Sequence, residues 1–334
     1  MDFHFLIASE RSGSNLITKM MDAHPDVCGP SPLHILRVLG MEYYRYGDLS
    51  KRDNWKILLN DLNDLLNSDF AKWQSKFDRN ELNSMADVGD LPTLLRSVFV
   101  KEATANGKNT LFIKELWTHR YISFLDWCFP DAKYVYLVRD PRDMALSWRN
   151  NPVHPGGVVA GARQWIHDQQ NTVINFRALH DAGRAMVVRY EDLVSQSEAS
   201  LRRICDLLGL AFSADMLAFH NNQLTQDNAD KNPLWKNLSR EVMSDNFNKF
   251  KKELTADEIA AIEVTCWPLL RYFGYQPATP MEKLQETKNV QINALHQIER
   301  KKYAPKPQQR LHDTIQNRLK RSHLRFHDLG NKQD

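Results

Sequence analysis

Short apolar runs alternate with amphipathic helical patterns along most of the chain. The apolar runs cover residues 3–8, 110–116, 134–138 and 186–188, and their lengths are those of buried strands. Each run is apolar throughout, which is typical of parallel strands that are covered on both faces. The pattern therefore predicts an α/β fold in which helices lie on both sides of a central, mostly parallel sheet.

Helical periodicity follows these strands. Apolar residues recur at helical spacing over residues 16–21, and Ser14 and Asn15 are expected to cap this helix. Thr255, with Glu258 three residues later, predicts a capping box at the start of a late helix. Further helices are predicted from Leu33, over residues 91–105 and 156–180, and over residues 201–208 before Gly209.

Two regions depart from the alternation. Residues 47–83 carry Trp and Leu on one helical face with Asp and Asn on the other, which predicts a helical insertion. Residues 281–334 hold 12 Lys and Arg against 6 Asp and Glu, in a chain whose net charge is only +3. We expect one domain over residues 1–280 and a basic C-terminal extension, helical or partly disordered, over residues 281–334.

The loop after the first strand has the composition of an anion-binding site. Residues 9–15 read Ser-Glu-Arg-Ser-Gly-Ser-Asn and join a strand end to a helix N-terminus. Free backbone N–H groups and the positive helix end point at one spot there, and Arg11 adds a fixed positive charge. The loop is not a Walker A motif, because GxxxxGK[ST] requires a second glycine and a lysine.

Two later stretches also place a polar side chain where a predicted strand ends. Arg139 ends the strand at residues 134–138, and Pro141 opens a helix that carries Ser147. The arginine at the strand end and the serine on the helix can therefore converge on one anion. In the third stretch, residues 186–193, Tyr190 stands at a strand end.

With these motifs the sequence resembles the sulfotransferases that use 3′-phosphoadenosine 5′-phosphosulfate (PAPS). In that family an [RK]-S-G-[ST]-[ST] loop holds the 5′-phosphosulfate, and an arginine with a serine eight residues later binds the 3′-phosphate. Arg139 and Ser147 match the second signature. Residues 11–29 look most like the bacterial and Golgi-type branches, including tyrosylprotein sulfotransferases. The loop matches at Arg11, Ser12, Gly13 and Ser14 and departs at Asn15, and Tyr190, Glu191 and Asp192 match the family's Y-E-D near the adenine.

The resemblance implies a P-loop-like three-layer α/β/α fold and a reaction. A sulfuryl group would move from PAPS to a hydroxyl or amine of a small molecule, glycan or lipid, under an insertion at residues 47–83 that covers the acceptor site. Arg11 would stabilise the leaving group, Lys114 would touch the sulfuryl group, and Arg240 would close over the 3′-phosphate. The family requires no metal.

The acceptor base is open between three residues. Related enzymes carry a glutamate about twenty residues after the loop arginine, but residues 29–34 contain no acid. His34 is the titratable side chain in that window, and a neutral imidazole near pH 7 can take a proton from a hydroxyl. Glu115 and His119 compete, because the cytosolic branch of the family draws its histidine from just after an equivalent strand.

Composition and charge limit the class of protein and the compartment that we expect for it. The net charge of +3 gives no sign of a nucleic-acid binder, and no apolar segment reaches the roughly 18 residues of a membrane span. Four widely spaced cysteines indicate neither a zinc site nor a disulfide framework, which favours a reducing compartment. Without an N-terminal anchor, we expect a cytoplasmic, bacterial enzyme. The basic extension could contact an acidic substrate, a membrane surface or a second subunit of a homodimer.

Two other functions are compatible with the predicted fold class or with the predicted nucleotide pocket. A nucleotide-dependent kinase would share the fold class, but the loop lysine, the second glycine and a Walker B aspartate are missing. A non-catalytic nucleotide-binding protein would keep the pocket and use its basic extension for partner contacts.

Overall fold

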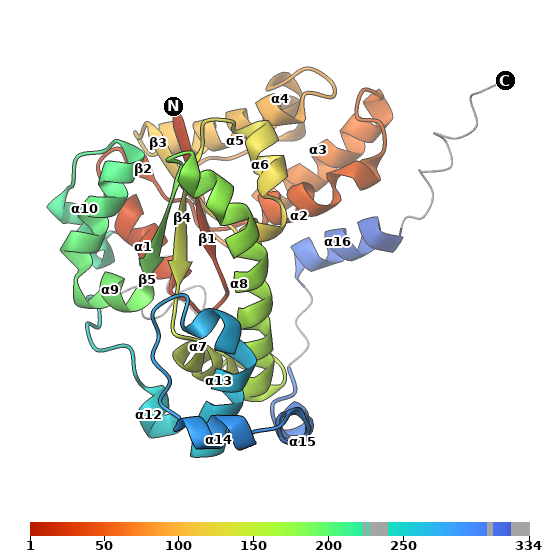
Figure 1. Cartoon of the computed structure of the whole chain (residues 1–334). Helices are drawn as coiled ribbons and strands as arrows, with labels where there is room; N and C mark the ends of the chain where they lie inside the picture. The colour runs from red at the N-terminus through yellow and green to blue at the C-terminus, as the bar shows by residue number, and fades with distance from the viewer. Residues whose placement is uncertain (223–225, 227–239, 306–309, 322–334) are drawn as a thin grey trace.

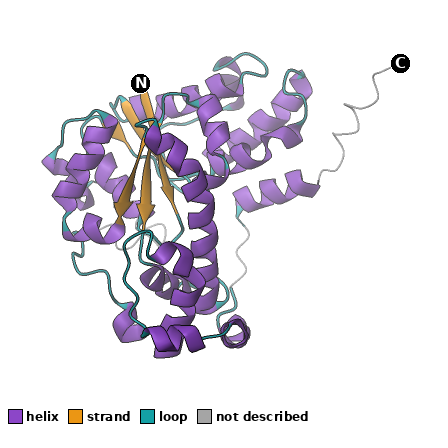
Figure 2. Cartoon of the chain, in the orientation of Figure 1, coloured by secondary structure: helices purple, strands orange, loops and turns teal. Residues whose placement is uncertain are grey.

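A parallel sheet forms the centre of the computed structural model, which describes residues 1–222, 226, 240–305 and 310–321. Over these residues the sheet has the order β2-β3-β1-β4-β5, and helices surround it (Figures 1 and 2). The predicted α/β/α architecture is confirmed. The strands are β1 Asp2–Ala8, β2 Val27–Cys28, β3 Thr110–Lys114, β4 Lys133–Val138 and β5 Ala185–Arg189.

The register brings the C-terminal ends of three strands to one edge of the sheet. In β1, Leu6 pairs with Lys114 of β3 and Ala8 pairs with Leu137 of β4. The three segments that follow these strands therefore begin side by side, which is where open α/β sheets bind ligands. Strand β2 was not predicted, because two residues between turn signals carry no periodicity.

Alternate residues of each strand pack into two separate cores. Leu6 of β1 and Leu137 of β4 contact one helical layer, whereas Phe5 and Tyr136 contact the other. The first layer contains α1 Ser14–Asp22, α9 Tyr190–Ser195, α10 Ser197–Leu208 and η3 Ala214–Asn221. The second contains α5 Leu91–Ala105, α6 Ile122–Cys128, α7 Pro141–Arg149, α8 Gly157–Asp181 and α13 Ala256–Leu270, with η2 Thr118–Arg120 at the end of β3.

Most predicted helices occur where the pattern placed them. Helix α5 has the predicted bounds, and α13 begins with the Thr255–Glu258 capping box. Helix α1 differs at its start, because its N-cap is Gly13 in the left-handed region (φ 90°) and no side chain caps it. The expected capping by Ser14 and Asn15 is therefore wrong, and the first-turn N–H groups are left for another partner.

The region at residues 47–83 is partly helical. It contains α3 Arg52–Leu66 and α4 Arg79–Ser84, which follow α2 Ile35–Glu42 and η1 Tyr43–Tyr46. Trp55, Leu58 and Leu62 of α3 are buried in the larger core, so this helix is part of the packed body.

The described part of residues 281–334 consists of three helices. These are α14 Met281–Glu286, α15 Asn289–Lys302 and α16 Leu311–Arg321, and the short α12 Phe250–Glu253 precedes α13. The Glu299 carboxylate of α15 accepts backbone N–H bonds from Val158 and Val159 at the start of α8 (2.9 and 3.0 Å). Helix α16 reaches α2, where Arg37 donates to Asp313 at 2.9 Å (Figure 1). Both helices thus pack on the α/β body.

Candidate functional site

A cavity of about 580 Å³ opens at the C-terminal edge of β1 and β4. A volume of this size suits a nucleotide-sized ligand. The three sequence motifs, which are far apart along the chain, all reach it. The lining includes Arg11, Gly13, Ser14 and Asn15 from the first loop, Arg139 and Ser147 from the β4–α7 segment, and Tyr190 from the start of α9.

Arg11 and Ser147 contact each other in this cavity. Arg11 Nε donates to Ser147 Oγ at 3.1 Å. The backbone of Arg11 is left-handed (φ 66°), a strained conformation for an arginine. Arg11 and Arg139 both line this cavity, and burial with the nearby charge of Arg139 lowers the pKa of Arg11. Such a pair is stabilised when an anion lies between its members.

Arg139 is held from three sides. Its two terminal nitrogens donate to the carbonyls of Arg11 (3.1 Å) and Asn246 (3.3 Å), and its guanidinium lies 4.3 Å from the centre of the Tyr190 ring. The remaining nitrogen, Nε, is buried and has no hydrogen-bond partner among the described residues. Asn246 also donates to the Tyr190 hydroxyl at 2.6 Å. The site therefore has a fixed guanidinium with a free donor.

Gly13 allows the loop to pass directly under Tyr190. A Cβ at this position would lie 2.4 Å from the Tyr190 ring, and the φ of 90° is unfavourable for any other residue. The neighbouring Ser12 hydroxyl is buried without a hydrogen-bond partner in the described residues. Together with the uncapped start of α1, this unused donor fits a phosphate or sulfate group at the loop.

A second, smaller cavity of about 80 Å³ adjoins the first and shares Arg11, Ser14 and Asn15 with it. His34 and Lys114 line it, together with residues that sequence reasoning did not single out. The further lining residues include Glu10, Phe70, His154 and Arg310. The arrangement places an imidazole and an ammonium group on the far side of Arg11 from the nucleotide-sized cavity.

His34 is buried at the start of α2. Its Nδ1 lies 3.5 Å from Glu115 Oε2, and its ring lies 4.1 Å from the His312 ring of α16. Burial, with the nearby charge of Lys114, lowers the pKa of His34 well below 6.5. The imidazole is therefore neutral at pH 7 and able to accept a proton.

Lys114 ends strand β3 and Glu115 follows it, but only Lys114 lines the smaller cavity. Lys114 lines the smaller cavity, whereas Glu115 lies behind His34 and accepts backbone N–H bonds from His34 and Ile35. Burial lowers the pKa of Lys114 and raises that of Glu115. The structure thus brings His34 and Lys114, and not Glu115, to the space beside Arg11.

Two other predicted residues lie outside both cavities. His119 of η2 is buried and faces Asp168 of α8, with Nε2 at 3.5 Å from Oδ1. Arg240 is exposed and lines neither cavity, although Glu241 and Met243 line the larger one. The other residues of the segment in which Arg240 was recognised, 235–239, lie outside the described part of the chain.

A Glu10–His154 pair is the main feature of the site that the sequence did not indicate. His154 Nε2 lies 3.2 Å from Glu10 Oε2. Although burial alone would raise the pKa of Glu10, the hydrogen bond and charge of His154 lower it to about 2. His154 belongs to a proline-containing loop after α7, and its approach to the first loop follows from tertiary packing that no local signal reports.

The chain belongs to the Sulfotransferase family, whose sequence model matches residues 4–214. Its relatives are enzymes that transfer sulfuryl groups, and the chain is a sulfotransferase. It is 25% identical to protein-tyrosine sulfotransferase A of Caenorhabditis elegans over 286 residues, 82% of this chain and 67% of that protein. It is 29% identical to carbohydrate sulfotransferase 2 of Mus musculus over 104 residues, 31% of this chain and 19% of that protein.

A solved structure supports the fold. The sulfotransferase domain of the Synechococcus PCC 7002 olefin synthase superposes with a TM-score of 0.56 at 21% identity, covering 83% of this chain and 95% of that domain.

The prediction of a cytoplasmic enzyme is wrong. It rested on the expectation that no anchor precedes the first strand, whereas the protein-tyrosine and carbohydrate sulfotransferases related to this chain are Golgi-resident. Within the described residues, no helix combines the length and apolar character that crossing a bilayer requires.

Proposed function

We propose that the protein transfers the sulfuryl group of PAPS to an acceptor hydroxyl, and that the protein-bound tyrosine phenol is the acceptor class. The observation that carries the proposal is the convergence of Arg11, Arg139, Ser147 and Tyr190 on one cavity, with His34 and Lys114 in the adjoining one. The larger cavity would hold the nucleotide and the smaller one would receive the acceptor.

Each group has a role that its position supports. Arg139, with its free Nε and its stack on Tyr190, and Ser147 would hold the 3′-phosphate. Ser12 and the first-turn N–H groups of α1 would hold the 5′-phosphate. Arg11, which lines both cavities, and Lys114, which lines the smaller one, would contact the sulfuryl group during transfer.

The transfer is an in-line displacement at sulfur. The acceptor oxygen forms a bond to sulfur while the bridging bond between sulfur and the phosphate oxygen breaks, and adenosine 3′,5′-bisphosphate leaves with the electron pair. Arg11 would stabilise the negative charge that builds on this oxygen. His34, which is neutral because of its burial, would take the proton of the acceptor hydroxyl.

The extent of the matches favours tyrosine over sugar as the acceptor. The protein-tyrosine sulfotransferases of Caenorhabditis elegans and Danio rerio match 82% and 67% of this chain, whereas carbohydrate sulfotransferase 2 matches 31%. A carbohydrate hydroxyl is the second candidate, because that shorter match has the higher identity, 29%.

The kinase alternative is disfavoured by the position of the first lysine after the loop. Lys19, on α1 after the loop, is buried and donates to Asp22 (3.3 Å) and to the carbonyl of Gly29 (3.1 Å). It therefore faces away from the loop and cannot take the part of a Walker A lysine.

The test uses PAPS labelled with ³⁵S and three acceptors: a tyrosine peptide, its phenylalanine counterpart and an oligosaccharide. We expect label on the tyrosine peptide alone. Label on the oligosaccharide alone would move the acceptor to the second candidate. Absence of PAPS-dependent transfer to any acceptor, together with no thermal stabilisation by adenosine 3′,5′-bisphosphate, would refute the nucleotide assignment.

A further inference from the structure

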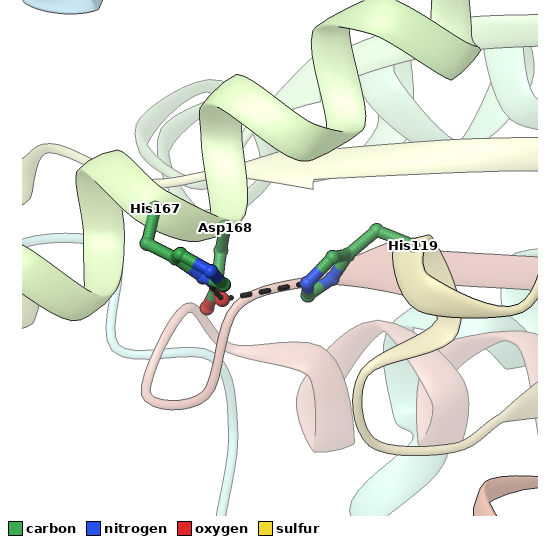
Figure 3. Close-up of side chains that lie close together, drawn as sticks. All are labelled: His119, His167 and Asp168. Carbon is green, nitrogen blue, oxygen red and sulfur yellow. Dashed lines mark ion pairs between the residues drawn. The ribbon is translucent and has the colours of Figure 1, made fainter. Parts of the chain in front are cut away.

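A cluster of three metal-ligating side chains lies between η2 and α8, outside both cavities. It consists of His119, His167 and Asp168, and Figure 3 shows the three side chains pointing toward one another. One ligand atom from each lies within 4.8 Å of the others. His119 was a candidate acceptor base by sequence, but it lines neither cavity, and the reaction proposed above assigns no role to these three residues.

The distances fit a small tetrahedral ion. Asp168 Oδ1 lies 3.5 Å from His119 Nε2 and 3.5 Å from His167 Nδ1. Ligand atoms of a tetrahedral zinc ion, with bonds of about 2.0–2.1 Å, lie roughly 3.3–3.4 Å apart. Small side-chain rotations would therefore suffice to bring the atoms onto an ion.

His119 lacks any other partner. Its side chain is buried, and neither ring nitrogen has a hydrogen-bond partner among the described residues. An imidazole that is buried with both nitrogens unused is costly, because the desolvation of its polar atoms is not compensated. It points at Asp168 from a distance too long for a hydrogen bond.

A simple ion pair does not account for the geometry. The two contacts of Asp168 Oδ1, 3.5 Å to each ring, are longer than hydrogen bonds, and a neutral imidazole offers one nitrogen lone pair to a ligand. Among the described residues, only the two histidines lie within ion-pair distance of Asp168. A divalent cation would use the lone pair and compensate the buried carboxylate at the same time.

We propose that His119, His167 and Asp168 bind a divalent transition-metal ion of the zinc class. Two imidazoles with one carboxylate suit zinc, cobalt or nickel, whereas magnesium and calcium prefer oxygen ligands alone. The side chain of His167 is 55% exposed, which gives the ion a path to the site.

The surroundings of the cluster support its ligands. Gln164 donates to Asp168 Oδ1 at 2.7 Å and orients the carboxylate.

The metal would connect the cluster to the first loop without entering the reaction. Ser9, the residue that leads into this loop, contacts Asp168 and accepts a hydrogen bond from Gln169 at 2.6 Å. An ion at the cluster would thus fix η2, α8 and the start of the loop relative to one another.

The chain offers a matched control on the same helix. His180 and Asp181 repeat the His-Asp pair of residues 167 and 168, with Nδ1 and Oδ1 3.6 Å apart, and both are exposed. No third ligand joins this pair in the described residues. His180→Ala therefore removes an equivalent histidine without touching the proposed site.

The experiment measures metal content in the full chain without an affinity tag. Wild type, His119→Ala, His167→Ala and His180→Ala are incubated with zinc, dialysed against metal-free buffer and analysed by mass spectrometry of the metal. We expect about one zinc per chain for wild type and His180→Ala, and a loss of at least roughly five-fold in the other two. Cobalt(II) should give the intense visible absorption of a tetrahedral site in wild type and in His180→Ala.

Two outcomes would overturn the proposal. One is a wild-type zinc content no higher than that of His167→Ala. The other is an equal loss in His167→Ala and His180→Ala. His167→Ala decides the question if His119→Ala fails to fold, because the His167 side chain is exposed. The four cysteines are buried, so they do not supply a competing surface site. No substrate is needed, so the result is independent of the proposed reaction.

Discussion

Replacing Arg139 with alanine should separate recognition of the 3′-phosphate from recognition of the rest of the nucleotide. Arg139 has one buried donor without a partner and two donors on the carbonyls of Arg11 and Asn246. If a 3′-phosphate takes one or two of these donors, each charge-assisted bond contributes about 1.5–3 kcal/mol. We therefore expect a loss of about 1.5–6 kcal/mol, or roughly 12- to 20,000-fold in affinity for adenosine 3′,5′-bisphosphate.

The assay compares two ligands by calorimetry, adenosine 3′,5′-bisphosphate and adenosine 5′-phosphate. The variant also loses the contact with the Arg11 carbonyl and the stack on Tyr190, which should weaken both ligands by a similar factor. The ratio of the two affinities isolates the 3′-phosphate. Arg149→Ala is the control, because this arginine lies at the end of α7, the helix that follows Arg139, but pairs with Glu258 and does not line the cavity.

Equal weakening of both ligands in Arg139→Ala would refute the reasoning, since Arg139 would then hold the loop without contacting the 3′-phosphate. An unchanged ratio in Arg149→Ala is required for the comparison to be valid.

Three further predictions concern the loop, the base and the buried pair. Arg11→Ala should lower turnover far more than it weakens product binding, because the charge of Arg11 matters most in the transition state. Single-turnover kinetics and a product titration measure the two effects, and a variant that binds product poorly yet turns over normally would contradict this prediction. His34→Ala should lower turnover about a hundredfold with product binding intact. Because burial lowers the pKa of His34 well below 6.5, the wild-type rate should show no acidic limb from this residue between about pH 6 and 7. A limb there that the variant lacks would contradict the lowered pKa, whereas near-normal turnover of the variant would contradict the role of His34 as the base. The pKa of Glu10 is depressed to about 2, so the stability it gains from His154 should be present above about pH 4.5 and lost as the pH falls toward 2. Urea unfolding should show a larger stability difference between wild type and His154→Ala at pH 5 than at pH 3, and equal differences would count against the pair.

The sequence predicted the parts of the site that follow strands. Arg11 and Arg139 each come just after an apolar run, and parallel strands end at one edge, so their convergence follows from topology alone. Ser147 was placed by helical spacing from Pro141, and its contact with Arg11 agrees with that placement. These inferences needed only periodicity and the direction of the strands.

The missed parts depend on contacts between distant segments. His154 lies in an irregular loop, and His312 comes from a helix whose position no local pattern specifies. The sequence did not single out Asp168, because helical periodicity predicts which face of a helix is buried but not that His119 lies opposite this residue. The start of α1 was misassigned, because a glycine in the left-handed region replaced the usual side-chain cap.

The packing of α16 against α2 has a consequence for the order in which the protein is completed during synthesis. Gln316 donates to the carbonyl of Arg37 across 279 positions of the sequence, and His312 covers His34. At about 5–20 residues per second, a ribosome needs roughly 14–56 s to add that stretch. The nascent chain therefore lacks the cover that His312 places over His34 until long after His34 itself has been made.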